Sequence, residues 1–181
     1  LTFDAYGVLP PISKLTPNQA AYQFISGYTS KVAGTEVGIT TPQKTFSACF
    51  GAAFMPLHPA EYGKMLAAKI KESGVNVWLV NTGYNGKMKS CSLKDTRALI
   101  TAALTGALNQ VEYKELPIFG FQVPQSCATV SDQSILNPEN TWDDKAQFAA
   151  KSKELAEAFI ENFKKFEAGA DAEVLKGAPK L

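Results

Sequence analysis

Apolar residues recur at helical spacing in two segments of the first half of the chain. Thr16 and Pro17 favour a helix start, because threonine caps free backbone N–H groups and proline suits the first turn, and the pattern ends at Gly27. A second helix is predicted from Pro59, with Gly74 as its stop. Its apolar face is formed by Tyr62, Met65, Leu66 and Ile70. Both segments therefore have the pattern of amphipathic helices packed on a core.

Two further helices are predicted in the second half. Ser92 followed by Asp95 resembles a capping box, and the helix it opens is predicted to run through Leu108. Its apolar side is formed by Leu99, Ile100, Ala103, Leu104 and Ala107. A last helix is predicted over about 143–166, with one stripe formed by Phe148, Leu155, Phe159, Phe163 and Phe166. We expect this stripe to pack against the body of the protein, and the small, polar tail after Ala168 to fray.

Extended segments separate these helices. Val75–Asn81 is short, β-branched and aromatic, and is followed by a glycine turn, which predicts a buried strand. The segment 111–124 has the pattern of one or two strands interrupted by Pro117 and Gly120, and 125–140 is rich in loop residues. Helices alternate with strands, and the chain has no internal repeat and no linker, so we expect one domain over 1–181.

The segment Gly27–Phe46 shows neither a helical nor a strand period. A loop this long is uncommon in a compact domain, and it favours either a mobile active-site lid or a structural loop. The apolar run 46–57 follows it, so we expect the segment to belong to a packed fold.

Composition narrows the function classes. The 181 residues are 45% hydrophobic and 19% charged with a net charge of +1, which indicates an ordinary globular protein without a field that would recruit nucleic acid or an acidic membrane. No apolar run approaches the roughly 20 residues that span a bilayer. The chain opens on Leu1 rather than Met, and we expect it to be a fragment of a longer protein.

Standard catalytic and metal-binding patterns are missing from the sequence. Three widely spaced cysteines, Cys49, Cys91 and Cys127, suit reduced thiols in a cytoplasmic protein, with Cys49 a buried small hydrophobe. His58 is the only histidine, and its place before a helix favours capping or packing over catalysis. Asp4 could cap a turn or orient a neighbouring side chain, and we expect the turn role. No zinc site, Ser-His-Asp triad or glycine-rich phosphate loop is predicted.

The best candidate for ligand contact is the turn 83–97, which follows the predicted strand and leads into a capped helix. Loops at the carboxyl ends of strands are where open α/β sheets bind ligands. Lys87, Lys89 and Lys94 lie near the helix N-terminus, which itself attracts anions. These residues favour a phosphate site, and the alternative is a solvated basic turn.

Four blocks of sequence then identify a family. DAYGVLPPISKLT at 4–16, SGYTSKVAGTE at 26–36, TFSACFGAAF at 45–54 and VNTGYNG at 80–86 resemble, in order and spacing, the C-terminal part of ATP-dependent phosphoenolpyruvate carboxykinase. The likeness continues more loosely to the end of the chain. It implies that 1–181 is the C-terminal part of that enzyme's mononucleotide-binding domain, an α/β fold with a mixed sheet and flanking helices.

The resemblance assigns a different ligand to the turn. In the ATP-dependent members the matching turn contacts adenine and ribose, which places nucleotide contacts on Ser90, Cys91 and Thr96. Family members usually read G-K-R here, and Ser90 stands at the arginine position. The stacking and cation–π contact of that arginine is therefore absent, and Lys89 replaces it only as a point charge.

The resemblance also assigns a role to the segment 27–46, which matches the family's mobile lid. Closure of the lid would exclude water and protect the enolate formed by decarboxylation before it is phosphorylated. The family often has arginine where this chain has Val37, so a contact made by that side chain would be lost.

The activity implied is a carboxy-lyase reaction, gluconeogenic or anaplerotic, in which oxaloacetate and ATP give phosphoenolpyruvate, carbon dioxide and ADP with Mg²⁺ and Mn²⁺. Catalytic residues and metal ligands are expected upstream of Leu1, in the N-terminal remainder of the same protein, and none is assigned in this segment. The alternatives are a non-catalytic nucleotide-binding module and, less well matched by the AGTE and NTG blocks, a GTP-dependent carboxykinase.

Overall fold

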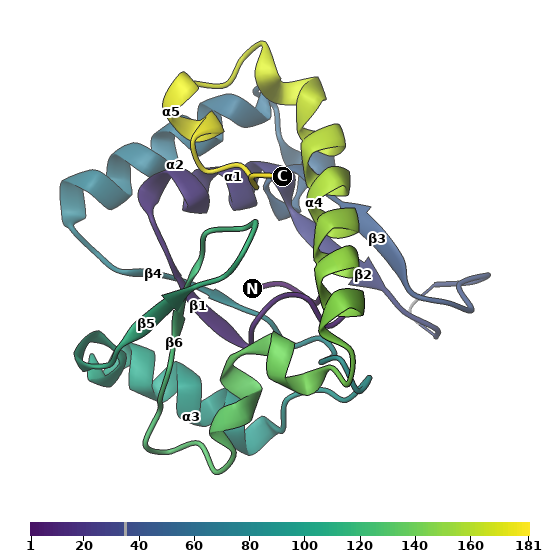
Figure 1. The fold of residues 1–181 in the computed structure, drawn as a ribbon. Helices are drawn as coiled ribbons and strands as arrows, with labels where there is room; N and C mark the ends of the chain where they lie inside the picture. Colours follow the sequence, from purple (N-terminus) through teal and green to yellow (C-terminus); the bar gives the residue numbers. More distant parts are fainter. Residues whose placement is uncertain (35) are drawn as a thin grey trace. The chain divides into compact units, whose positions relative to one another are not determined.

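The computed structural model describes residues 1–34 and 36–181 (Figure 1). It divides into two compact units, each formed by two separate stretches of the chain. Unit 1 is Leu1–Lys14 with Trp78–Lys153, and unit 2 is Leu15–Val77 with Glu154–Leu181. Because each unit is discontinuous, its boundaries fall inside strands and a helix rather than in a linker, which explains why composition marks no boundary.

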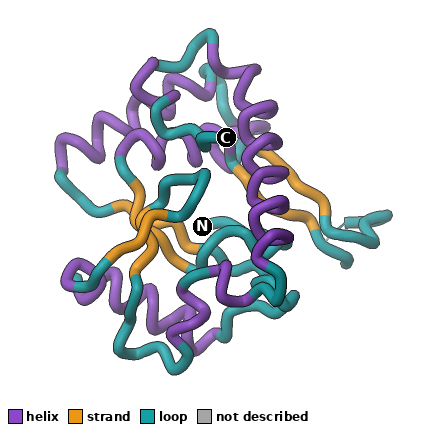
Figure 2. Tube along the Cα trace, viewed as in Figure 1, coloured by secondary structure: helices purple, strands orange, loops and turns teal. Residues whose placement is uncertain are grey.

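Unit 1 is organised by a small sheet, drawn in orange in Figure 2. The strand order is β4 (Val77–Val80), β1 (Ile12–Leu15), β6 (Gln122–Pro124) and β5 (Tyr113–Glu115). β6 runs antiparallel to both of its neighbours, and a parallel bridge joins Thr2 to Asn81. The predicted α/β class with a mixed sheet and flanking helices is therefore confirmed.

Helix α3 (Leu93–Leu104) covers this sheet. Its buried residues Leu99 and Ala102 pack with Ile12 of β1, and Trp78 and Val80 of β4 lie against the same cluster. The helix was predicted to run through Leu108, which was wrong, since it ends at Leu104. The chain turns at Gly106, which has a φ of 80°, and enters a 3₁₀ turn at Ala107–Gln110. The predicted apolar side was also wrong at two positions, since Ile100 and Leu104 are 37% and 83% exposed.

Unit 2 is built from α1 (Pro17–Ser26), α2 (Pro59–Ser73), α5 (Ala172–Leu175) and most of α4 (Lys145–Glu167). Thr16 caps α1 as predicted, since its hydroxyl accepts from the Gln19 N–H and the Gln19 side chain accepts from the Thr16 N–H. Gly27 and Gly74 end α1 and α2 in the left-handed conformation that favours glycine.

The phenylalanine stripe of α4 is buried, as predicted. Within unit 2 the Phe163 ring stacks on Tyr22 with centroids 4.1 Å apart, and Phe159 lies 5.0 Å from Tyr28. Two other expectations were wrong. Met65 of α2 is 60% exposed, and the tail does not fray, because Val174 is buried and Gly177 contacts the backbone of Asn18 closely enough to leave no room for a side chain.

The segment 27–46 is only partly a loop. Strands β2 (Tyr28–Lys31) and β3 (Gln43–Phe46) form an antiparallel hairpin with Tyr28 opposite Phe46. The irregular part is thus confined to 32–42, and position 35 of it lies outside the described residues. The strand signal was missed because the alternation is only four residues long on each side, too short to register as a period.

The apolar run that follows is less buried than expected. Cys49 is buried as predicted, but Phe50, Phe54 and Leu57 are 45%, 86% and 56% exposed. The run forms two short 3₁₀ turns, Ala48–Phe50 and Ala52–Phe54, rather than one helix with a single buried face. Side chains of successive tight turns point in several directions, so an apolar composition does not place all of them inside.

Candidate nucleotide-binding site

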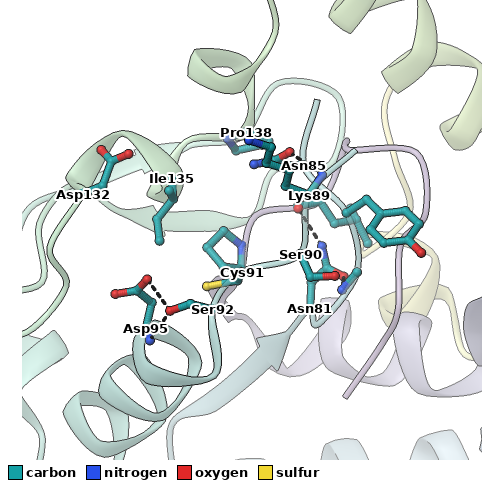
Figure 3. Close-up of a pocket in the computed structure, with 14 residues that line it drawn as sticks. Asn81, Asn85, Lys89, Ser90, Cys91, Ser92, Asp95, Asp132, Ile135 and Pro138 are labelled. Atoms are coloured by element: carbon teal, nitrogen blue, oxygen red, sulfur yellow. Dashed lines mark hydrogen bonds between the residues drawn. The ribbon is translucent and has the colours of Figure 1, made fainter. Parts of the chain in front are cut away.

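The turn 83–97 borders a cavity of about 270 Å³ in unit 1 (Figure 3). The cavity approaches the size range of small-molecule sites in proteins, which begins at about 300 Å³. Its described lining comes from three segments: Leu9 and Pro11; Asn81, Gly83, Tyr84, Asn85, Lys89, Ser90, Cys91, Ser92 and Asp95; and Asp132, Ile135 and Pro138. A strand end, a helix start and a distant loop therefore meet at one cavity.

A buried polar network fixes the first wall. Asp4 is fully buried, and its carboxylate accepts hydrogen bonds from the N–H groups of Tyr6, Val8 and Leu9 at 2.8–3.0 Å. Asp4 thus caps a turn, as predicted. Its own N–H donates to Asn81 Oδ1 at 2.9 Å, so the turn is attached to the end of β4.

Asn81 connects this turn to the ligand-contact loop. Its Oδ1 accepts from the Gly83 N–H at 2.9 Å, and its Nδ2 donates to the Leu9 carbonyl at 2.8 Å. Asn81 is 4% exposed and uses both ends of its amide. Because such a buried amide is costly to leave unpaired, Asn81 holds Leu9 and Gly83 in fixed positions on the cavity wall.

The floor of the cavity is the start of α3. Ser92 caps the helix as predicted, since its hydroxyl accepts from the Asp95 N–H at 3.0 Å. The same hydroxyl donates to Asp95 Oδ2 at 2.6 Å, so the short aspartate reaches the cap hydroxyl where glutamate in a capping box would reach the cap N–H. In Figure 3, Asp95 and Asp132 lie on one side of the cavity, and Asn85 and Lys89 on the other.

The structure brings together two of the three sequence-predicted nucleotide contacts. Ser90 and Cys91 line the cavity, with Ser90 exposed and Cys91 half-buried. Thr96 is not among the described lining residues, but its side chain lies near the Cys91 thiol. Burial raises the pKa of this thiol, the neighbouring Thr96 side chain opposes the shift, and the nearby Asp95 charge adds to it.

The phosphate prediction made from the lysines alone receives little support. Of the three lysines only Lys89 lines the cavity, whereas two carboxylates, Asp95 and Asp132, also line it. Hydrogen bonds from Ser134 lower the pKa of Asp132 and favour its ionised form. A cavity with apolar walls and two carboxylates suits a base and a ribose better than a phosphate group.

Sequence reasoning missed the wall formed by Leu9, Pro11, Asp132, Ile135 and Pro138. Asn81 also lines the cavity, and its position gave a signal: it is the last residue of the predicted strand, and ligand-binding loops follow the carboxyl ends of strands. No comparable signal marked Ile135 or Pro138, because their place beside the turn depends on how a loop-rich segment folds back. His58 acts as expected, since its Nδ1 accepts from the Ala60 N–H at 3.3 Å at the start of α2.

Other kinds of site find no support in residues 1–34 and 36–181. No group of three or more histidine, cysteine, aspartate or glutamate side chains there is placed to hold a metal ion. No helix in this part of the chain is long and apolar enough to cross a membrane. The three cysteines are free thiols.

Comparison with known proteins decides the family. Residues 1–133 match the family model of phosphoenolpyruvate carboxykinase. The chain belongs to this family. Proteins named phosphoenolpyruvate carboxykinase (ATP) from Flavobacterium johnsoniae, Christiangramia forsetii and Brucella anthropi are 59%, 55% and 54% identical to it, over 99%, 99% and 100% of its length.

The resemblance to this family is therefore confirmed. The chain spans about a third, 34%, of the length of these curated relatives. The cavity beside 83–97 is thus one region of a carboxykinase-family chain whose relatives are about three times longer.

Proposed function

We propose that this chain is the C-terminal, nucleotide-binding part of an ATP-dependent phosphoenolpyruvate carboxykinase. The whole enzyme, formed with an N-terminal remainder of the same protein, converts oxaloacetate and ATP to phosphoenolpyruvate, carbon dioxide and ADP in the cytoplasm. The observation that carries the proposal is the cavity lined by Ser90 and Cys91, at the turn where the family contacts its nucleotide. Relatives at 52–59% identity, all named as ATP-dependent enzymes, support the same reading.

The role proposed for the cavity is to hold adenine and ribose. Leu9, Pro11, Ile135 and Pro138 offer apolar surface to the faces of the base. Ser90, Cys91 and Asn85 offer polar groups to its edge or to the sugar. A pocket with apolar walls and a few placed polar groups is the usual form of a small-molecule site.

The position of Ser90 bears on how tightly the base is held. The family's arginine would stack on the base, and a serine hydroxyl cannot replace that contact. Lys89 lines the same cavity and supplies a positive charge without a planar surface. We therefore propose that the apolar walls carry more of the base contact here than in relatives with the arginine.

The metals belong to the same proposal. Mg²⁺ and Mn²⁺ would stabilise the enolate and the transferred phosphoryl group in the whole enzyme. The residues present here do not fit a metal site, since the described part of the chain offers no cluster of three ligands. The metal ligands, the phosphate loop and the groups that bind oxaloacetate are accordingly proposed to lie in the N-terminal remainder.

The hairpin loop between β2 and β3 is proposed to serve as the lid of the whole enzyme. Its tip residue Val37 is fully exposed, and Lys31 and Glu36 form an ion pair of 2.7 Å on the surface. Exposed pairs of this kind contribute little stability, so the loop can change conformation at low cost. Such a change is what lid closure requires.

The test is a turnover assay of the full protein with oxaloacetate and Mn²⁺, first with ATP and then with GTP. ATP-dependent formation of phosphoenolpyruvate and ADP is the expected result, with GTP much less effective. Tight ATP binding without turnover would contradict the proposal and favour a non-catalytic nucleotide-binding module. Preference for GTP would instead assign the chain to the GTP-dependent enzymes.

A further inference from the structure

The side chain of Thr141 connects two segments that border the cavity. Thr141 is 6% exposed and ends the 3₁₀ turn Pro138–Thr141. Its hydroxyl accepts a hydrogen bond from the Gly86 N–H at 2.8 Å and donates one to the Pro138 carbonyl at 2.7 Å. One buried oxygen therefore joins the turn 83–97 to the distant loop that carries Pro138.

Trp142 adds a third segment to this connection. Its Nε1–H donates to the Gly7 carbonyl at 2.9 Å, and Gly7 belongs to the Asp4 turn. The indole also lies against Gly86, where a Cβ atom would come within 2.4 Å of the ring. Gly7 in turn lies so close to the backbone of Asn85 and Gly86 that a Cβ there would be 2.7 Å away.

These three segments are the ones that supply the walls of the cavity. Leu9 follows Gly7, Asn85 precedes Gly86, and Pro138 accepts the Thr141 hydroxyl. Neither Thr141 nor Trp142 is among the described lining residues. The Thr141 hydroxyl and the Trp142 indole are instead bonded to the segments that form the walls.

We propose that Thr141 is a positioning residue of the nucleotide cavity, and that Trp142 assists it by holding the Gly7 turn. The proposal rests on the proposed function, because it takes the ligand to be the adenine nucleotide. Nucleotide contacts made by rigidly held walls cost little ordering on binding, whereas a wall displaced by about 1 Å loses much of its affinity.

Removal of the Thr141 hydroxyl should have a local effect. Thr141→Val keeps the shape of the side chain but leaves the Gly86 N–H and the Pro138 carbonyl without their partner. Both groups are then driven toward water, and the two walls separate. Thr141→Ser keeps the hydroxyl and should restore both hydrogen bonds.

The experiment is a calorimetric titration of the full protein with ATP, which gives both the dissociation constant and the number of binding sites. Thr141→Val is expected to raise the dissociation constant about tenfold with an unchanged number of sites. Thr141→Ser should stay within about twofold of wild type. Thr105→Val is the matched control, since the Thr105 hydroxyl donates to the Thr101 carbonyl on the exposed side of α3, and it should change neither quantity.

The two measured quantities separate positioning from folding. A merely structural role would lower the number of sites in proportion to the unfolded fraction and leave the dissociation constant of the folded molecules unchanged, and this result would overturn the proposal. An equal loss of affinity in Thr141→Val and Thr141→Ser would overturn it as well, because the hydroxyl would then not be the active feature.

If Thr141→Val does not fold, Trp142→Phe takes its place. It keeps an aromatic ring but removes the Nε1 donor to Gly7 and part of the ring beside Gly86. An affinity loss of about threefold with an unchanged number of sites supports the proposal, and no loss overturns it. A wild-type protein that binds no ATP overturns the proposed function and this inference together. ATP binding in the wild type with no change in any variant overturns this inference alone.

Discussion

The turn 83–97 and the hairpin loop 32–42 are built in opposite ways. Gly83 in the turn lies against Asp4, and a Cβ atom there would be 2.0 Å from the Asp4 carbonyl oxygen. Gly34 and Gly38 in the hairpin loop have φ angles of 84° and 86°, and a Cβ atom at either position would meet no other atom within 4 Å. Glycine in the turn thus allows two backbone segments to pack closely, whereas glycine in the loop allows a positive φ angle.

The difference separates two tasks within one proposed enzyme. The turn is held by buried hydrogen bonds of Asp4, Asn81 and Thr141, so the cavity exists before a ligand arrives. The described part of the hairpin loop is mostly exposed and makes a surface ion pair. A preformed cavity favours binding, and a loosely held loop favours a conformational step, so substitutions in the two regions should affect different quantities.

The largest effect is expected for Gly83→Ala. The new methyl group would overlap the Asp4 backbone, and backbone atoms cannot move aside as a flexible side chain can. We expect the free energy of unfolding to fall by about 3 kcal/mol or more, measured by denaturant unfolding.

Gly34→Ala is the control for this substitution. Alanine has free space there but must adopt a positive φ, so a loss of only about 1 kcal/mol is expected. Equal losses at the two glycines would contradict the contrast between a packed turn and an open loop.

Removal of residues 34–38 should affect turnover more than binding. The described residues of this loop lie on the surface, so their loss should cost little stability, while lid closure during the reaction would fail. We expect kcat to fall by about two orders of magnitude, and the ATP dissociation constant to stay within about twofold. A parallel loss of both quantities, measured by steady-state kinetics and titration, would show that the loop acts in binding or folding instead.

Much of the fold could be predicted because local signals dominate it. Thr16, Ser92, Gly27 and Gly74 mark helix ends through backbone hydrogen bonds or a positive φ, which depend only on nearby residues. Gly83 shows the limit of this reasoning. Its role depends on Asp4, almost eighty positions earlier, and no local pattern reveals such a contact.

The candidate site was predictable only in part for the same reason. Ser90 and Cys91 lie on a loop that follows a recognisable strand, and the family resemblance named them. Ile135 and Pro138 come from a loop-rich segment whose path is set by Thr141 and by the hydrogen bonds of Gln133 to the backbone of Cys127. Long-range contacts of this kind leave no period in the sequence.

Thr96→Ala should have a moderate effect confined to the turn. The Thr96 side chain lies near Cys91, which lines the cavity, and the family resemblance places a nucleotide contact on Thr96. We expect ATP affinity to fall by about 1 kcal/mol, roughly fivefold, in the full protein. Thr96→Ser should retain wild-type affinity, and an unchanged affinity in Thr96→Ala would remove Thr96 from the proposed site.

The smallest effect is expected for Met88→Gly. Met88 has a φ of 56°, a left-handed conformation that costs a residue with a side chain about 1–2 kcal/mol of conformational free energy. Met88 is also 57% exposed. Glycine removes this strain but adds chain entropy to the unfolded state, so a net gain of about 0.5 kcal/mol in unfolding free energy is expected. A loss of stability by the same denaturant measurement would show that the Met88 side chain makes a stabilising contact.

Alkylation of Cys91, which lines the cavity, tests directly whether ATP binds beside the turn 83–97. Cys49 and Cys127 are 5% and 2% exposed, so Cys91 should be the thiol that alkylates first. Because burial raises the pKa of the Cys91 thiol, little of the reactive thiolate is present at pH 7. The rate of Cys91 alkylation should therefore still rise with pH where the alkylation rate of an ordinary thiol has levelled off.

The measurement is the rate at which iodoacetamide labels each cysteine of the full protein, with and without saturating ATP. Labelling is carried out at about pH 8.5, near the ordinary pKa of a thiol, and is followed by peptide mass spectrometry. If ATP binds beside the turn 83–97, it should slow labelling of Cys91 about tenfold or more and leave the labelling rates of Cys49 and Cys127 unchanged. If titration shows that ATP is bound and the labelling rate of Cys91 is unchanged, the nucleotide lies elsewhere and the proposed site is wrong.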